Sequence, residues 1–225
     1  MESRPDELAY AGEEHRDPAY VATYDRKTGF DAASEVGLLE RLGLGPETTF
    51  VDLGAGTGLL ADAVAGRCGR VVAVDPSPAM LDAARARGGR FECVEAGFLT
   101  YEHAGDPPGI VYSRNALHHL PDAWKALALD RVARLLARGG TLVLRDIVYP
   151  CEPHELDGVL AAWFDGAVDD PAEGWTHAEL ERHVRTEHST FSWLLEPMLE
   201  RAGLRIDEVW YSDSRTYARY VCARA

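Results

Sequence analysis

A glycine-rich turn between an apolar run and a helical pattern constrains this sequence more than any other feature. Residues 49–53 form the apolar run, Gly-Ala-Gly-Thr-Gly follows at residues 54–58, and the helical pattern begins at Leu59. Glycines permit positive φ angles and let a ligand lie against bare backbone, where the amides at the start of the helix face it. The turn therefore predicts a ligand-binding edge of an α/β sheet.

The rest of the chain has the alternation that such a sheet requires. Short runs rich in Val, Ile and Leu alternate with helix-length segments, which is the pattern of parallel strands joined by crossover helices. We expect strands at residues 49–53, 70–75, 90–95, 109–113 and 141–148, with helices at residues 59–67, 77–87 and 123–137. Helical patterns follow at residues 153–168, 176–186 and 190–202, and an antiparallel hairpin closes the chain at residues 205–211 and 217–225.

The spacing of the glycines separates two kinds of nucleotide site. A nicotinamide-binding turn has the pattern GxGxxG, whereas Gly54, Gly56 and Gly58 form GxGxG. Asp75 ends the next strand, where a carboxylate can accept hydrogen bonds from both ribose hydroxyls of an adenosine. The pattern disfavours a nicotinamide-dependent oxidoreductase, which stays as the alternative from another enzyme class.

At these residues, and at the segment Asn-Ala-Leu-His-His-Leu-Pro-Asp over residues 115–122, the chain resembles the class I methyltransferases that depend on S-adenosylmethionine. The resemblance extends from about residue 49 to residue 148. It implies an α/β fold with a Rossmann-like, seven-stranded, mostly parallel sheet, helices on both faces and an antiparallel last strand. A helical cap would be inserted after the fifth strand.

The resemblance implies S-adenosyl-L-methionine as cofactor and S-adenosyl-L-homocysteine as product. The expected cofactor contacts lie in the glycine turn and at the ends of the following strands: Asp52, Gly54, Gly56, Gly58, Asp75, Met80, Gly97, Phe98, Ser113 and Asn115. One departure concerns the adenine, because the family commonly places an Asp after the third strand to accept its amine. Here Glu95 is out of register for that role, and the partner of the amine stays open.

Polar and aromatic residues after the fourth strand and in the cap are candidates for the acceptor side, since ligands gather beyond the carboxyl ends of such strands. We predict substrate contacts at Tyr20, Tyr24, Arg114, Trp163 and Trp175. A general base, where the acceptor releases a proton, would come from His118, His119, Glu173 and His177. We expect no metal site, because the adjacent histidines point in different directions and Asp146 lacks an acidic partner after strand four.

The implied reaction is transfer of a methyl group to a small molecule. The chain is similar to bacterial natural-product methyltransferases, and its cap and Tyr-rich N-terminal region are similar to those of enzymes acting on the indole carbon 3 of tryptophan-containing cyclic dipeptides. O- or N-methylation of a phenolic or amine metabolite is the alternative within the same class.

Composition bounds the domains and partners. We expect a flexible lead-in over residues 1–17 and a single domain over 18–225, with lid helices at 18–48 and the cap at 150–190. The net charge of -14 opposes binding to nucleic acid or an anionic membrane surface, and no segment approaches the roughly 20 apolar residues of a membrane span. Four scattered cysteines fit reduced thiols. A cytoplasmic monomer or homodimer is expected.

Overall fold

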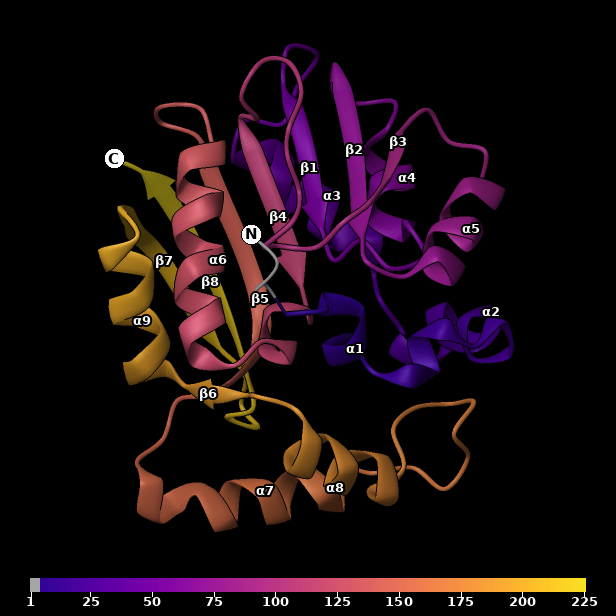
Figure 1. Ribbon diagram of the computed structural model, residues 1–225. Coiled ribbons are helices and arrows are strands. Elements are labelled where there is room, and N and C mark those ends of the chain that lie inside the picture. Colours follow the sequence, from indigo (N-terminus) through magenta and orange to yellow (C-terminus); the bar gives the residue numbers. More distant parts are fainter. Residues whose placement is uncertain (1–4) are drawn as a thin grey trace.

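A twisted sheet runs through the centre of the computed structural model, which describes residues 5–225 (Figure 1). Its parallel strands are β1 (Thr49–Leu53), β2 (Arg70–Asp75), β3 (Glu92–Glu95), β4 (Ile110–Arg114) and β5 (Thr141–Tyr149). With β7 (Leu204–Tyr211) and β8 (Tyr217–Arg224), the order is β3-β2-β1-β4-β5-β8-β7. Strand β8 is antiparallel to both neighbours. The Rossmann-like sheet with an antiparallel last strand is confirmed.

One short strand differs from the expectation. Residues 190–191 form β6 (Thr190–Phe191), which pairs with the end of β5, whereas the pattern had predicted that a helix begins at residue 190. The helix α9 (Ser192–Arg201) starts immediately afterwards. β-branched and aromatic side chains at Thr190 and Phe191 favour extended backbone, and the end of β5, which extends beyond its pairing with β4, provides the partner.

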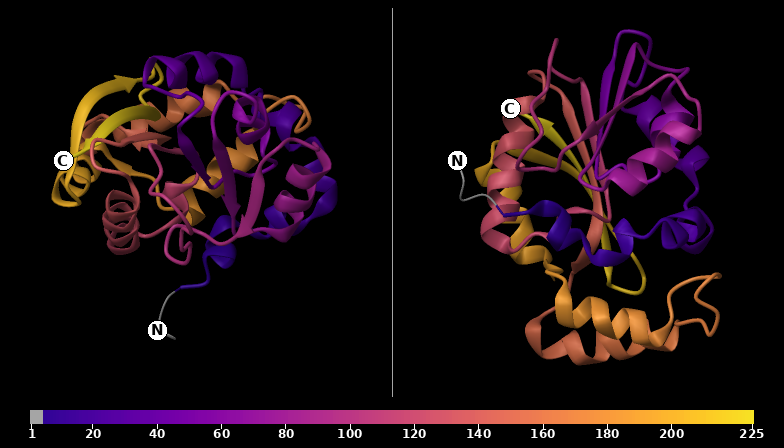
Figure 2. Two further views of the ribbon diagram at one scale, coloured as in Figure 1. Left: turned by 90° about the horizontal axis from the view of Figure 1, so that it is seen from above. Right: turned by 45° about the vertical axis from the view of Figure 1, so that its right-hand side comes forward.

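Helices cover both faces of the sheet because successive strand residues point to opposite sides. Phe50 of β1 packs in the cluster that contains α3 (Ala32–Arg41) and α4 (Leu59–Val64). Val51 points the other way, into the cluster with α6 (Asp122–Leu135) and α9. The helix α5 (Pro78–Ala86) packs against β3 and β2. Figure 2 shows these layers from two further directions.

The strand order reverses between β1 and β4, and the carboxyl ends of β1, β2, β4 and β5 meet at one edge. Below this edge in Figure 1 lie the N-terminal helices and the cap. Ligands of open α/β sheets bind at such a switch point. The fold therefore places a candidate site between the sheet edge and these two covering segments.

The N-terminal segment, for which we expect a flexible lead-in over residues 1–17, contains helices where the structure describes it. Residues 5–17 contain α1 (Glu7–Ala11) and the short helix η1 (Glu13–Arg16), and α2 (Pro18–Thr28) follows. The Glu7 carboxylate is buried and accepts hydrogen bonds from the Leu99 amide and the Thr100 hydroxyl, both at 3.0 Å. This anchor fixes α1 over the sheet edge. Residues 1–4 lie outside the described residues.

The cap consists of η3 (Pro153–Glu155), α7 (Leu156–Asp165) and α8 (His177–Thr186), which lie beyond the sheet edge (Figures 1 and 2). Buried Lys27 of α2 pairs with Glu179 of α8 at 2.5 Å and donates to the Pro171 carbonyl at 3.2 Å. Helix α2 and the cap are therefore joined across the site.

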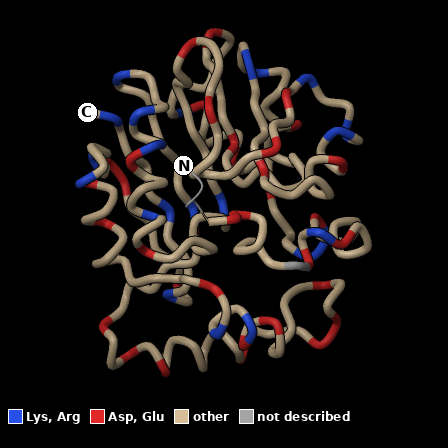
Figure 3. The backbone as a smooth tube through the Cα atoms, viewed as in Figure 1, with Lys and Arg blue, Asp and Glu red and all other residues tan. Residues whose placement is uncertain are grey.

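Charged residues of both signs are spread over the sheet half and the cap alike (Figure 3). The 37 acidic residues outnumber the 23 Lys and Arg residues, so the surface is acidic as a whole. Within residues 5–225, none of the helices has the length and apolar character needed to cross a membrane.

Candidate active site

The glycine turn after β1 is held in a conformation that side chains would disrupt. Gly54, Gly56 and Gly58 have φ angles of +76°, +53° and +71°, in the region that favours glycine. A Cβ atom at Gly54 would lie 2.4 Å from the Cβ of Ala116, and one at Gly58 would lie 2.8 Å from the Cβ of Ala84. A Cβ atom at Gly56 would make ordinary contacts, 3.7 Å from the Tyr24 ring and 4.0 Å from Sδ of Met80, and the Gly56 amide donates to Asp75 at 2.8 Å. The end of β2 thus fixes the turn.

Two buried carboxylates lie beneath this turn. Burial raises the pKa of the Asp75 carboxyl group. The hydrogen bonds that Asp75 accepts from the amides of Gly56 and Ser77 oppose this shift but do not cancel it. Burial, and next the negative Asp75, raise the pKa of Asp52 to about 7, while Arg114 opposes this shift. The pair makes the region beneath the turn favourable for a positively charged ligand group.

A cavity of about 610 Å³, here called the loop cavity, opens beside the glycine turn. Seven of the ten predicted cofactor contacts line it: Gly54, Gly56, Asp75, Met80, Gly97, Phe98 and Asn115. Asp52 lines a smaller adjoining cavity under the turn. Gly58 and Ser113 line neither, because Gly58 begins α4 against Ala84 and Ser113 is fully buried in β4.

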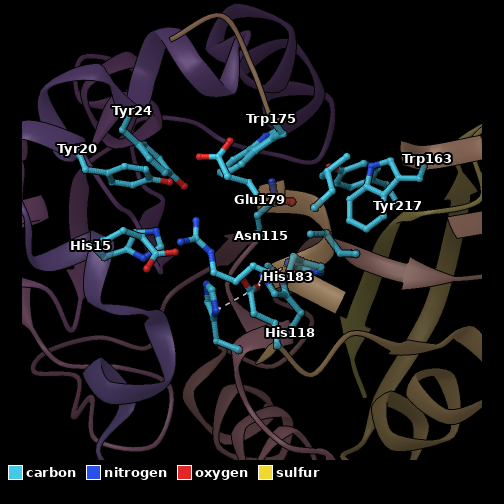
Figure 4. Close-up of a pocket in the computed structure, with 16 residues that line it drawn as sticks. His15, Tyr20, Tyr24, Asn115, His118, Trp163, Trp175, Glu179, His183 and Tyr217 are labelled. Carbon is cyan, nitrogen blue, oxygen red and sulfur yellow. Dashed lines mark ion pairs between the residues drawn. The ribbon is translucent and has the colours of Figure 1, made fainter. Parts of the chain in front are cut away.

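A second cavity of about 610 Å³, the cap cavity, lies between α2, the residues after β4 and the cap (Figure 4). Four predicted substrate contacts line it, and Figure 4 shows them around its rim: Tyr20, Tyr24, Trp163 and Trp175. The fifth, Arg114, instead lines the loop cavity, and its guanidinium lies 4.3 Å from the centre of the Phe30 ring.

The two cavities share part of their walls. His15, Tyr24, Asn115 and His119 line both of them. Asn115 follows β4 with a φ of +50°, and its amide donates to the Arg145 carbonyl at 2.8 Å. This turn at the end of β4 brings the two histidines that follow it to the boundary between the cavities.

His118 is held by carboxylates on both ring nitrogens. Its Nδ1 is hydrogen-bonded to Asp146, and its Nε2 lies 2.8 Å from Oε2 of Glu187. Burial by itself lowers the pKa of His118, but Asp146 and Glu187 outweigh it and raise the pKa to about 9. The same contacts with His118, and with His183, lower the pKa of Glu187 against the effect of burial.

His119 has the opposite character. Burial, and next the neighbouring His118, lower its pKa well below the usual histidine value, so its imidazole is neutral. Its Nδ1 is buried and has no hydrogen-bond partner, although it lies 3.4 Å from Oε2 of Glu187. A neutral imidazole with an unused nitrogen at the boundary of two cavities can accept a proton or a hydrogen bond from a ligand.

Glu173 and His177, the other two predicted bases, lie outside both cavities. Both are exposed, and Nδ1 of His177 lies 3.9 Å from Glu181 on its own helix. The sequence reasoning missed several residues that do line the cap cavity: His15, Glu179, His183, Glu187 and Tyr217. The four-residue spacing of His183 and Glu187 puts them on one side of a helix, but no local pattern shows that this side faces the sheet.

Comparisons with known sequences agree on one family. Residues 50–140 match a family model described as a methyltransferase domain. An uncharacterized methyltransferase of Geobacillus kaustophilus is 32% identical over 200 residues, covering 82% of this chain and 86% of that protein. Trans-aconitate 2-methyltransferase of Methylobacterium radiotolerans is 38% identical over 143 residues, which are 60% of this chain and 53% of that relative. The match thus spans about half the length of that relative.

Solved structures share the fold at low sequence identity. Magnesium protoporphyrin IX methyltransferase from Synechocystis, with bound S-adenosylmethionine, matches with a TM-score of 0.67, 15% identity and full coverage of both chains. The N-methyltransferase NodS from Bradyrhizobium japonicum, in complex with S-adenosylhomocysteine, has a TM-score of 0.59 and 17% identity over 85% of this chain and 86% of that chain. The [4+2]-cyclase SpnF has a TM-score of 0.63 and 15% identity over 86% and 80%.

Proposed function

The chain belongs to the class I methyltransferases that depend on S-adenosylmethionine, and from that premise we propose that its loop cavity holds this cofactor and its cap cavity holds a small-molecule acceptor. The observation that carries the proposal is the wall of four residues that the two cavities share. The sulfonium of the cofactor supplies an activated methyl group. The main contribution of the protein is then to align the two reactants at close contact.

The residues of the loop cavity fit the cofactor. Asp75 offers a buried carboxylate to the ribose hydroxyls, beside the bare backbone of Gly56. The buried Nε of Arg114 has no hydrogen-bond partner, which suits the carboxylate of the methionine part. Asp52 and Asp75 favour the positive charge that the same part carries.

Glu7 is our candidate for the missing carboxylate of the adenine site. It reaches the loop cavity from α1, and a Cβ atom at Gly97 would lie only 2.3 to 2.7 Å from its carboxyl atoms. A side chain at position 97 and the Glu7 carboxylate therefore exclude one another. We propose that Glu7 accepts the hydrogen bond of the adenine amine, in the place where the family commonly has an Asp.

His119 is our candidate for the general base. Of the four residues predicted for this role, it is the one that lines both cavities and keeps an unpartnered ring nitrogen. His118 is engaged by two carboxylates, and the other two are exposed. We assign to the His119 imidazole the proton that an acceptor releases during methylation.

The acceptor that we propose is an aromatic molecule without strong negative charge. Aromatic side chains surround the cap cavity together with a few polar groups, which is the usual lining of small-molecule sites. Its acidic residues are Glu14, Glu179 and Glu187, and the cations beside them are Arg182, the protonated His118 and the Lys27 that pairs with Glu179. The cavity therefore has no excess of positive charge, which disfavours a tricarboxylate such as trans-aconitate. The indole carbon 3 of a tryptophan-containing cyclic dipeptide is our first candidate, and a phenolic or amine metabolite is the second.

The test is a panel assay that follows S-adenosylhomocysteine formation by mass spectrometry. It should contain tryptophan-containing cyclic dipeptides, phenols, aromatic amines and trans-aconitate. We expect a methylated aromatic product with the wild type and none with Asp75→Ala, which loses the ribose acceptor. Tight cofactor binding without methylation of any panel member would contradict the proposed reaction, and a methylated tricarboxylate would contradict the proposed acceptor class.

A further inference from the structure

Three side chains of metal-binding type meet in the wall of the cap cavity. One ligand atom each of His118, His183 and Glu187 lies within 4.8 Å of the other two. Oε2 of Glu187 is 2.8 Å from Nε2 of His118 and 2.8 Å from Nδ1 of His183. With bonds of about 2.1 Å, two ligands of one ion are about 3.0 Å apart at a right angle and about 3.4 Å apart at the tetrahedral angle. The two distances to Glu187 are slightly shorter than this spacing, and the two nitrogens lie within 4.8 Å of one another, so small side-chain shifts would bring the three atoms around one ion.

The other ring nitrogen of each histidine is already held by a neighbour. Nδ1 of His118 is hydrogen-bonded to the carboxylate of Asp146, and Nε2 of His183 lies 2.8 Å from the hydroxyl of Ser189. Metal-binding imidazoles are oriented in this way, because the outer partner fixes the ring and the tautomer. Both remaining nitrogens face Glu187.

Apart from the histidines, of which His118 is protonated, the carboxylates around the cluster have no cationic partner in the described part of the chain. Asp146 and Glu187 have side chains that are 2% and 21% exposed, and both contact His118. Within residues 5–225, neither carboxylate forms an ion pair with a lysine or an arginine. A divalent cation would compensate this charge where water is largely excluded.

We propose that His118, His183 and Glu187 bind one divalent first-row transition-metal ion. Two histidines and one carboxylate form the ligand set of many catalytic zinc and non-haem iron sites. From the sequence we expect no metal site, because the adjacent histidines at 118 and 119 point in different directions and Asp146 lacks an acidic partner. The fold supplies the other two ligands from the end of α8.

The position of the cluster suggests what the ion would do. All three ligands line the cap cavity, so an ion held by them would be accessible to the acceptor. A carbonyl or hydroxyl oxygen of an aromatic acceptor would bind there, and the ion would act as a Lewis acid on it. This link to methyl transfer rests on the proposed function, whereas the metal site itself does not.

The experiment measures metal binding alone, on the tag-free full chain after chelator treatment, without cofactor or acceptor. Calorimetry with Zn²⁺ and visible spectra with Co²⁺ should show one ion per chain. His183→Ala and Glu187→Gln should weaken binding by about 100-fold, and Ser189→Ala by about 10-fold. His154→Ala removes an exposed histidine elsewhere in the cap and should leave binding unchanged.

The proposal is overturned if the wild type does not bind one ion per chain with a Kd below about 10 μM. It is also overturned if Glu187→Gln binds the ion as tightly as the wild type does. Circular dichroism checks the folding of each variant. If His183→Ala fails to fold, Glu187→Gln still tests the site, because glutamine keeps the shape of the glutamate side chain. Calorimetry with S-adenosylhomocysteine on the same samples separates the two proposals. Metal binding without cofactor binding would contradict the proposed function alone, and the reverse would contradict the metal site alone.

Discussion

The loop cavity and the cap cavity have similar volumes but are assembled in different ways. Most of the loop cavity comes from residues 54–120, at the ends of adjacent parallel strands. The cap cavity draws on His15, Trp163, Glu187 and Tyr217, which come from four separate parts of the chain. The first therefore depends on local turn geometry, and the second depends on how the N-terminal helices and the cap pack over the sheet edge.

This difference separates the two roles in the proposed reaction. The loop cavity is fixed by positive φ angles and by the Gly56–Asp75 hydrogen bond, both within the sheet half. The cap cavity is closed by contacts such as the Lys27–Glu179 pair, which joins α2 to α8. Substitutions on one side should therefore change cofactor affinity, and substitutions on the other side should change turnover.

The largest expected effect concerns His119, where the two cavities meet. His119→Ala should lower turnover by about 100- to 10,000-fold with an acceptor that releases a proton, because the base is lost. The affinity for S-adenosylhomocysteine should stay within about threefold, since other residues hold the cofactor. Single-turnover kinetics and calorimetry measure the two quantities separately. A parallel loss of both would mean that His119 belongs to the cofactor site.

The next effect concerns the glycine turn. Gly56→Val should weaken binding of S-adenosylhomocysteine by about 100-fold or more, because a branched side chain is strained at this φ and fills the loop cavity. Gly29→Val is the matched control. Gly29 has the same φ of +53° and open space around it, so the control should reduce stability but leave cofactor affinity unchanged. Normal affinity in Gly56→Val would remove the turn from the site.

A third prediction uses pH. Because the folded-state pKa of Asp52 is raised to about 7, the folded protein binds more protons than the unfolded chain between about pH 4 and 7. Its contribution to the free energy of unfolding therefore falls as pH rises through this window. The free energy of unfolding of Asp52→Asn, relative to that of the wild type, should increase by about 2 to 3 kcal/mol from pH 5 to pH 8.

Urea unfolding of both proteins without ligand measures this difference. The ionised carboxyl of Asp75 disfavours the charged form of Asp52 and the guanidinium of Arg114 favours it, so both contributions belong to the effect that is measured. A stability difference independent of pH would show that Asp52 is ionised throughout the range.

The smallest effect concerns Glu7 and the adenine amine. Glu7→Gln should weaken the binding of S-adenosylhomocysteine by about fivefold, because a charged hydrogen-bond acceptor becomes neutral. It should also reduce the preference for S-adenosylhomocysteine over S-inosylhomocysteine, which carries a carbonyl in place of the amine. Glu47→Gln alters an exposed carboxylate in the segment before β1 and serves as the control. An unchanged preference would assign Glu7 to folding of α1 alone.

The difference between the two cavities also explains which features could be predicted from the sequence and which could not. The strand positions and most of the loop cavity follow from local signals, such as the glycine spacing and the position of Asp75 at the end of its strand. The antiparallel last strand, in contrast, is implied by the resemblance to class I methyltransferases. Glu7 escaped notice because its polar surroundings in sequence suggest a flexible lead-in, and only the fold brings it to Gly97. His183 and Glu187 escaped for a similar reason, because their contact with His118 depends on cap packing.

The central claim is that two adjoining cavities hold the cofactor and the acceptor, with His119 between them. A crystal structure of the chain with S-adenosylhomocysteine tests it most directly. We predict the ribose hydroxyls on Asp75, the adenine beside Phe98, and the sulfur at the shared wall, next to His119. S-Adenosylhomocysteine bound in the cap cavity, or bound with its sulfur away from that wall, would contradict the claim.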